Sequence, residues 1–192
     1  MIGRLALALV HQPVLDRNGA VVSAAVTNLD LHDIARAART YGAGRFYVVT
    51  DAPGQQELVR RILGHWQEGF GAGYNPDRRE ALSLVETVPD LAAAQAAWSA
   101  SCGAPALPLL TGARRSDGIS FSAARERLER QPLLLVLGTG WGLAPELFDH
   151  GWPILEPISG GTDYNHLPVR AAAAIILDRL YRAGRVVHPD QK

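Results

Sequence analysis

The feature that most constrains this chain is an apolar run, Leu133 to Leu137, that stops at a cluster of glycines. Gly138, Gly140 and Gly142 follow the run at once, and a second passage rich in proline and glycine extends from Pro153 to Gly161. A buried strand that feeds glycines is how α/β folds bring bare backbone against a flat polar ligand. The chain has two such loops, separated by about the length of one helix, and the fold alone would not require both. This region therefore predicts a binding site.

Strand-like apolar stretches alternate with segments of helical spacing along the chain. Strands are expected at residues 5–10, 46–49, 84–87, 107–110 and 133–137, and helices at 30–41, 55–66, 91–100, 122–130 and 166–182. Ser122 and Asn165 are the expected N-caps of the last two helices, and the glycine-rich stretch 69–76 is expected to be a loop. The alternation predicts one α/β domain over residues 1–192, with a mostly parallel sheet flanked by helices.

The strand ends predict where a ligand would bind. In open α/β sheets, ligands bind beyond the carboxyl ends of the strands. Four loops follow strands in this chain, and we expect them to converge on one site. They begin near His11, Thr111, Gly138 and Ile158.

The composition excludes several classes of site. Cys102 is the single cysteine, which excludes an internal disulfide and a multi-cysteine metal site, and the six histidines show no metal-ligand spacing. Lys192 is the single lysine, which excludes Schiff-base chemistry and lysine-dependent phosphate binding. The net charge of zero means that a nucleic acid would have to meet a local basic patch. No run is long enough to span a membrane and the start does not read as a signal peptide, so we expect a cytoplasmic protein without a metal.

One alternative is a nicotinamide-dependent oxidoreductase. The dinucleotide fingerprint needs glycine at its first, third and sixth positions, which here are Gly138, Gly140 and Leu143. The third glycine is missing, and the motif lies near the end of the chain instead of at its beginning. Glu156 could mimic the ribose-binding acid of such enzymes, although Leu155 and Pro157 beside it are typical of a strand end.

Three separated motifs, in order, carry a resemblance to a known family. They are Gly138-Thr139-Gly140-Trp141-Gly142-Leu143, Pro157-Ile158-Ser159-Gly160 and Tyr164-Asn165-His166-Leu167-Pro168-Val169-Arg170. The chain resembles the SPOUT class of S-adenosylmethionine-dependent RNA methyltransferases. It is most similar to a small bacterial subfamily, some of whose members are fused to a tRNA guanine methyltransferase.

The resemblance implies a C-terminal trefoil knot, a homodimer and a bent S-adenosylmethionine held between three loops. It implies that the acceptor is RNA, with tRNA and rRNA both open. Backbone exposed at glycines would meet the adenine edge, and apolar side chains would wall the site; a valine at Gly140 is expected to abolish binding and leave the fold intact. The implied cofactor residues are Thr111, Gly112, Leu137, Gly138, Thr139, Gly140, Gly142, Leu143, Ile158, Gly160, Asn165 and Leu167.

Two residues are the candidates for catalysis. Arg36 lies six residues before the helix-ending Gly42, as does an arginine in the first motif of the ribose methyltransferases of this class. Asp30 occupies the position nearest to that motif's asparagine. A base-nitrogen acceptor would need a carboxylate instead, and Asp163 beside the cofactor loop is the candidate. Ribose oxygen and base nitrogen therefore both stay open as the acceptor atom.

Partner surfaces follow from the arginines and from the last helix. Arg114 and Arg115 are the arginine pair closest to the predicted site, so we expect them to contact RNA. The last helix is apolar nearly all round, which predicts a second copy of the chain as its cover, with Val169, Ala173 and Ile176 in the interface. A second alternative is a catalytically silent module that keeps the dimer and the cofactor pocket but only docks RNA or a partner enzyme.

Overall fold

The core of the protein is a five-stranded parallel sheet, seen in a computed structural model that describes residues 3–181. The strand order is β5-β4-β1-β7-β6, and every neighbouring pair is parallel. The predicted mostly parallel α/β sheet is therefore confirmed. The strands are β1 (Leu5–Val10), β4 (Arg45–Val49), β5 (Val85–Val88), β6 (Leu107–Leu110) and β7 (Leu133–Gly138).

The central strands are buried on both sides because helices cover both faces of the sheet. All six residues of β1 are buried, which explains why β1 reads as a continuous apolar run instead of an alternating one. Leu5, Leu7 and Leu9 point into one apolar cluster, and Ala6 and Ala8 point into another on the opposite face. The small alanines let a helix approach the second face closely.

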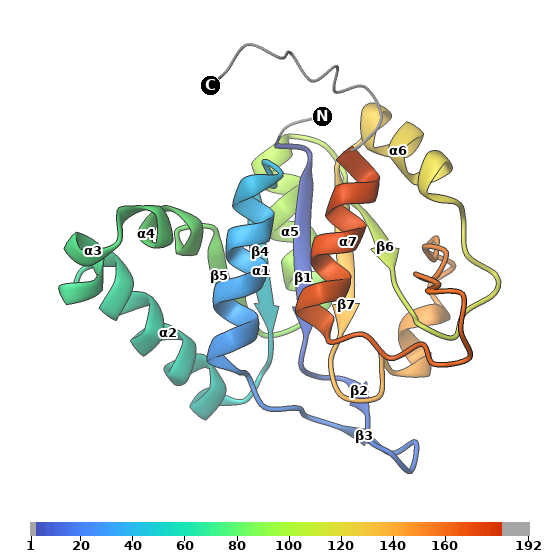
Figure 1. Ribbon diagram of the computed structural model, residues 1–192, viewed down its shortest axis with the longest axis horizontal. Helices are drawn as coiled ribbons and strands as arrows, with labels where there is room; N and C mark the ends of the chain where they lie inside the picture. The colour runs from blue at the N-terminus through green and yellow to red at the C-terminus, as the bar shows by residue number, and fades with distance from the viewer. Residues whose placement is uncertain (1–2, 182–192) are drawn as a thin grey trace.

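The helices form two layers around the sheet (Figure 1). Helices α1 (Asn28–Thr40) and α7 (Val169–Tyr181) lie side by side across the front face, with α6 (Phe121–Arg130) beside α7. Helix α5 (Leu91–Cys102) covers the back face. Helix α2 (Pro53–Gln67) extends from the β5 edge, and a hairpin of β2 (Val14–Leu15) and β3 (Val21–Val22) lies below the end of β1.

Two short helices occupy the segment predicted to be a glycine-rich loop, so that prediction was wrong. Helix α3 (Phe70–Tyr74) begins right after α2, and α4 (Pro76–Leu82) follows, with the Asn75 side chain capping it by accepting from the Arg78 N–H. The glycine at position 71 serves close packing: a Cβ there would lie 2.6 Å from the Trp66 ring. Gly71 therefore allows α3 to pack closely against Trp66 and does not mark irregular backbone.

Helix α6 begins earlier than predicted, since Ser120 caps it and Ser122 lies in its first turn. The Ser120 hydroxyl accepts a hydrogen bond from the Ala123 N–H at 3.2 Å. Ile119 is still extended and pairs with Leu155, so the helix starts as soon as this pairing ends.

Helix α7 begins at Val169, three residues later than predicted, and Asn165 does not cap it. The residue before a proline is disfavoured in the helical region, so Leu167 cannot be helical and the helix starts after Pro168. The Pro168 carbonyl accepts the first helical bonds, from Ala171 and Ala172. The predicted end of this helix, Arg182, lies outside the described residues.

The buried face of α7 packs against its own subunit. Ala173, Ile176, Leu177 and Leu180 are buried in the cluster shared with α1, α6 and the sheet. Ala173 and Ile176 therefore cannot supply a dimer interface, which corrects that expectation. Within residues 3–181, no helix is long and apolar enough to cross a membrane.

Candidate functional site

A cavity of about 650 Å³ opens beyond the carboxyl ends of β6 and β7. Three loops that are distant in the sequence meet there: the loop after β6, the loop after β7 and the segment that leads into α7. The start of α1 closes a further side. The lining residues are Leu15, Ala24, Ala25, Thr27, Asp30, Thr111, Gly112, Ala113, Arg114, Arg115, Leu137, Gly138, Thr139, Gly140, Trp141, Gly142, Leu143, Pro145, Phe148, Leu155, Glu156, Pro157, Ile158, Asn165, His166, Leu167, Pro168, Val169, Arg170, Ala172 and Ile176.

The loops predicted from the sequence to converge do line this one cavity. All of the residues expected to bind the cofactor are among the lining residues except Gly160. Arg114 and Arg115 line the cavity as well. The His11 loop contributes through Leu15, since His11 itself is fully buried and does not line the cavity.

The glycines of the β7 loop permit tight packing more than ligand approach. A Cβ at Gly138 would lie 2.8 Å from the Leu143 nitrogen, and one at Gly140 would lie 2.8 Å from the Leu15 carbonyl oxygen. Gly140 also has φ of +58°, which disfavours other residues. Gly142 differs, because its φ is +113° and nothing lies within 4 Å of a Cβ built there. We expected glycine at position 140 to be required by the ligand; the structure shows that the protein's own packing requires it as well.

Side-chain hydrogen bonds fix the loops in place. The Thr111 hydroxyl donates to the Val136 carbonyl at 2.9 Å, and the Thr139 hydroxyl donates to the Val10 carbonyl at 2.9 Å. Asn165 Nδ2 donates to the Ala113 carbonyl at 3.0 Å and so joins the segment before α7 to the loop after β6. These contacts hold backbone N–H and C=O groups around the cavity in a fixed arrangement.

The hairpin after β1 supports the β7 loop from outside. The Trp141 N–H donates to the Leu15 carbonyl, and the Leu15 N–H donates to the Gly142 carbonyl, both at 2.9 Å. These two hydrogen bonds, together with the close approach at Gly140, pack the β7 loop directly against the hairpin. The hairpin is one reason why the loop keeps its shape.

The two catalytic candidates from the sequence lie outside the cavity. Arg36 is exposed on α1, Asp163 is exposed in the segment before α7, and neither lines the cavity. The cavity instead contains Asp30, Glu156 and Arg170, which were not predicted as site residues. Asp30 carried a signal, because it occupies the position nearest to the family asparagine. The convergence of Arg170 with it depends on the packing of α7 against α1.

Ion pairs partly neutralise the charged residues that line the cavity. Arg170 Nη1 lies 3.4 Å from Asp30 Oδ1, and its Nε lies 3.5 Å from Asp33 Oδ2. Arg115 forms an ion pair with Asp117 and lies 4.6 Å above the centre of the Phe148 ring. Arg114 is exposed at the rim and makes no ion pair among the described residues. The rim beside the β6 loop is therefore the basic side of the opening.

Glu156 has a structural partner. Its Oε1 accepts a hydrogen bond from the Phe121 N–H at 2.7 Å, which satisfies one of the first N–H groups of α6. The carboxylate thus joins the segment that follows Leu155 to the start of α6. That contact differs from the ribose-binding role that the nicotinamide alternative would have required.

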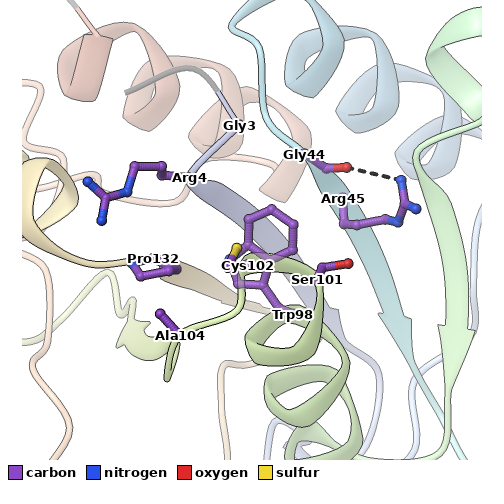
Figure 2. A pocket seen from close by; sticks show the side chains of 9 residues that line it. All are labelled: Gly3, Arg4, Gly44, Arg45, Trp98, Ser101, Cys102, Ala104 and Pro132. Carbon is purple, nitrogen blue, oxygen red and sulfur yellow. Dashed lines mark hydrogen bonds between the residues drawn. The ribbon is translucent and has the colours of Figure 1, made fainter.

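A second cavity, of about 360 Å³, lies at the opposite end of the sheet (Figure 2). Two of its polar side chains hold the fold together: the Arg4 guanidinium donates to the Glu129 and Arg130 carbonyls, and Trp98 Nε1 donates to the Leu133 carbonyl. Burial raises the pKa of the Cys102 thiol, which disfavours a reactive thiolate. No residue predicted to be functional lines this cavity, so we assign it no part in the site.

Metal ligands do not gather within residues 3–181. No group of three or more His, Cys, Asp or Glu side chains there is arranged to hold a metal ion.

Comparison with known proteins places the fold and the family. A curated tRNA (guanine-N(1)-)-methyltransferase of Nitratidesulfovibrio vulgaris is 44% identical over 173 residues, which are 90% of this chain but 41% of that protein. This chain therefore spans less than half the length of that relative. Among solved structures, a probable methylase family protein from Haemophilus influenzae Rd KW20 has a TM-score of 0.62 at 16% identity, covering 95% of this chain and 67% of the other.

A second solved structure has a cofactor. The SpoU methyltransferase AviRb from Streptomyces viridochromogenes, in complex with AdoMet, has a TM-score of 0.55 at 17% identity, covering 92% of this chain and 56% of the other. At this identity the likeness shows the fold alone. The sequence profile of one family, described as SAM-dependent RNA methyltransferase, matches residues 4–182. The chain belongs to this family of S-adenosylmethionine-dependent RNA methyltransferases.

Proposed function

We propose that this chain binds S-adenosylmethionine in the cavity beyond β6 and β7 and transfers its methyl group to RNA. The observation that carries the proposal is the convergence of three motif-bearing loops on one cavity. Its volume, about 650 Å³, lies in the range of small-molecule sites. The residues that hold the cofactor in this proposal are Thr111, Gly112, Leu137, Gly138, Thr139, Gly140, Gly142, Leu143, Ile158, Asn165 and Leu167.

The lining has the chemistry that a nucleoside needs. Leu137, Leu143, Ile158 and Leu167 supply apolar walls for a flat base, and Gly142 leaves open space beside its backbone. When bound, S-adenosylmethionine supplies a methyl group on a sulfonium, which is a good leaving group. The chain then needs to position the acceptor and accept one proton.

RNA is the proposed acceptor substrate, held first at the basic rim. Arg114 and Arg115 line the cavity, so in this proposal they contact the phosphate backbone of an RNA whose base or ribose enters it. We propose tRNA before rRNA, because the relative from Nitratidesulfovibrio vulgaris is named a tRNA methyltransferase. Arg36 and Asp163 would take part only if bound RNA or a second subunit bridged the distance to the cavity.

A homodimer is the proposed assembly. The side of α7 that faces away from the sheet carries half-buried apolar residues, Ala171, Ala174 and Ile175, and α1 lies beside it. A second copy seated on this surface would cover these side chains. The surface replaces the interface residues expected from the sequence, two of which are buried within the subunit.

Calorimetric titration tests the cofactor proposal. The purified chain should bind S-adenosylmethionine and S-adenosylhomocysteine with dissociation constants on the order of micromolar, and NADH and NADPH should give no heat of binding. Tight binding of a nicotinamide dinucleotide without binding of S-adenosylmethionine would replace this proposal with the oxidoreductase alternative.

A further inference from the structure

Two carboxylates line the cavity, and their surroundings differ. Glu156 is committed to the first turn of α6 through the Phe121 N–H. Asp30 is the other, at the start of α1, with a side chain that is 12% exposed. A group that takes a proton from a bound substrate has to reach the cavity and lie within hydrogen-bond distance of the acceptor. Asp30 is the carboxylate that is placed for this.

Neighbouring side chains hold the Asp30 carboxylate in one orientation. The Thr27 hydroxyl donates to Oδ2 at 2.6 Å, and Arg170 Nη1 lies 3.4 Å from Oδ1. The Asp30 N–H in turn donates to the Thr27 hydroxyl oxygen, so both residues form a closed cap on α1. A carboxylate has about four lone-pair sites. These contacts therefore leave it able to accept a further proton.

His11 is the buried titratable residue whose charge interacts with that of Asp30. His11 is completely buried, and neither ring nitrogen has a hydrogen-bond partner of standard geometry within the described residues. Burial is the largest influence on the pKa of His11 and lowers it, while the Ala24 carbonyl and the Asp30 charge oppose this to a lesser degree. A neutral imidazole there leaves Arg170 as the one positive group contacting Asp30 among the described residues.

From this geometry we propose that Asp30 is the catalytic residue that accepts the proton of the methylated RNA atom, and that Arg170 is its positioning residue. In the step, the acceptor nitrogen or oxygen forms a bond to the methyl carbon. The carbon–sulfur bond breaks with its electron pair left on sulfur, and the proton on the acceptor moves to an Asp30 oxygen. The proposal rests on the proposed methyl transfer and names the residue that serves it.

The structure offers a matched control for this assignment. Asp33 contacts the same arginine, at 3.5 Å, but its side chain is 46% exposed and it does not line the cavity. If Asp30 acted only by holding Arg170, then Asp30→Asn and Asp33→Asn would have similar effects. If Asp30 accepts the proton, Asp30→Asn should be far more damaging. Asp30→Glu keeps a carboxylate and tests whether the charge or the shape of the side chain matters.

The experiment measures transfer of labelled methyl groups to total RNA from a strain that lacks this protein. With Asp30→Asn, the single-turnover rate should fall at least about a hundredfold, a typical loss for general-base catalysis. The affinity for S-adenosylmethionine, measured by calorimetry, should stay within about twofold, which shows that the variant is folded with an intact cavity. Asp33→Asn should lose less than about threefold, and Asp30→Glu should recover part of the lost rate.

Different results would contradict the assignment of Asp30 and the proposed methyl transfer. A rate for Asp30→Asn within about threefold of the unmodified chain, or equal losses for Asp30→Asn and Asp33→Asn, would overturn the assignment of Asp30. The assignment would also be overturned if the Asp30→Asn protein did not bind the cofactor while the Asp30→Glu protein bound the cofactor but was inactive. If the unmodified chain labels no RNA, the proposed methyl transfer fails, and the assignment fails with it.

Discussion

The side-chain amide of Asn165 donates a hydrogen bond to the backbone carbonyl of Ala113 at 3.0 Å. These residues belong to two segments on opposite sides of β7 in the sequence, and both segments line the cavity. The contact therefore closes the wall of the site between the segment before α7 and the loop after β6. It replaces the helix-capping role expected for Asn165.

Replacing Asn165 with alanine should weaken cofactor binding about fivefold, since one hydrogen bond contributes about 1 kcal/mol. Thr162→Ala is the control, because Thr162 bonds within its own loop and does not line the cavity. Calorimetry with S-adenosylmethionine measures both. Equal affinity for Asn165→Ala and the unmodified chain would show that the two loops keep their places without this bond.

Valine at position 140 should remove cofactor binding and also lower stability. Gly140 has φ of +58°, and a Cβ there would lie 2.8 Å from the Leu15 carbonyl oxygen. The left-handed backbone alone costs about 1–3 kcal/mol for a branched residue. Chemical denaturation measures the loss of stability, and calorimetry measures binding.

Gly160→Ala is the matched glycine control, because position 160 has open space, lacks a positive φ and does not line the cavity. It should leave both quantities unchanged. A Gly140→Val protein with ordinary affinity would place the cofactor elsewhere.

Much of the fold was predictable because the parallel sheet leaves a direct mark on the sequence. Strands β1 and β6 have the predicted bounds, since a strand buried on both faces is a continuous apolar run between polar turns. Helix α3 was not predicted, because Gly71 is required by a close contact with Trp66 of the preceding helix. Local patterns do not contain such information.

The sequence predicted the loops of the cavity and the pair Arg114 and Arg115, but not the meeting of Asp30 with Arg170. Glycine motifs after strands identified the β7 loop and the segment before α7. Asp30 and Arg170 are far apart in the sequence and meet only because α1 and α7 lie side by side on one face of the sheet. The trefoil knot and the homodimer are implied by the family resemblance and stay predictions.

Arg114→Ala should weaken RNA binding about three- to tenfold without changing cofactor affinity. Arg114 is exposed at the rim of the cavity, where it can meet a phosphate. Loss of one phosphate contact to single-stranded RNA should reduce the slope of log affinity against log salt by about 0.7. Filter binding of tRNA over a range of salt concentrations measures this slope.

Arg60→Ala is the control for Arg114, because Arg60 is exposed on α2 and already paired with Glu57. An unchanged salt slope for Arg114→Ala would remove this residue from the RNA surface.

A glutamate at Ile175 should convert the proposed dimer into a monomer. Ile175 is half-buried on the side of α7 that faces away from the sheet, so its charge would be desolvated in an interface between two copies. Sedimentation velocity should show a dimer for the unmodified chain at micromolar concentration and a monomer for Ile175→Glu. A monomeric unmodified chain, or a variant that stays dimeric, would contradict the proposed interface.

The central claim is that this chain methylates RNA with S-adenosylmethionine. Mass spectrometry of RNA nucleosides from a strain lacking the protein tests it most directly, followed by incubation of that RNA with the purified chain and cofactor. We expect one methylated nucleoside to be absent from the strain and to reappear after incubation. If the chain binds S-adenosylmethionine but no methylated nucleoside is lost or restored, it is a catalytically silent binding module, and the claim of methyl transfer is wrong.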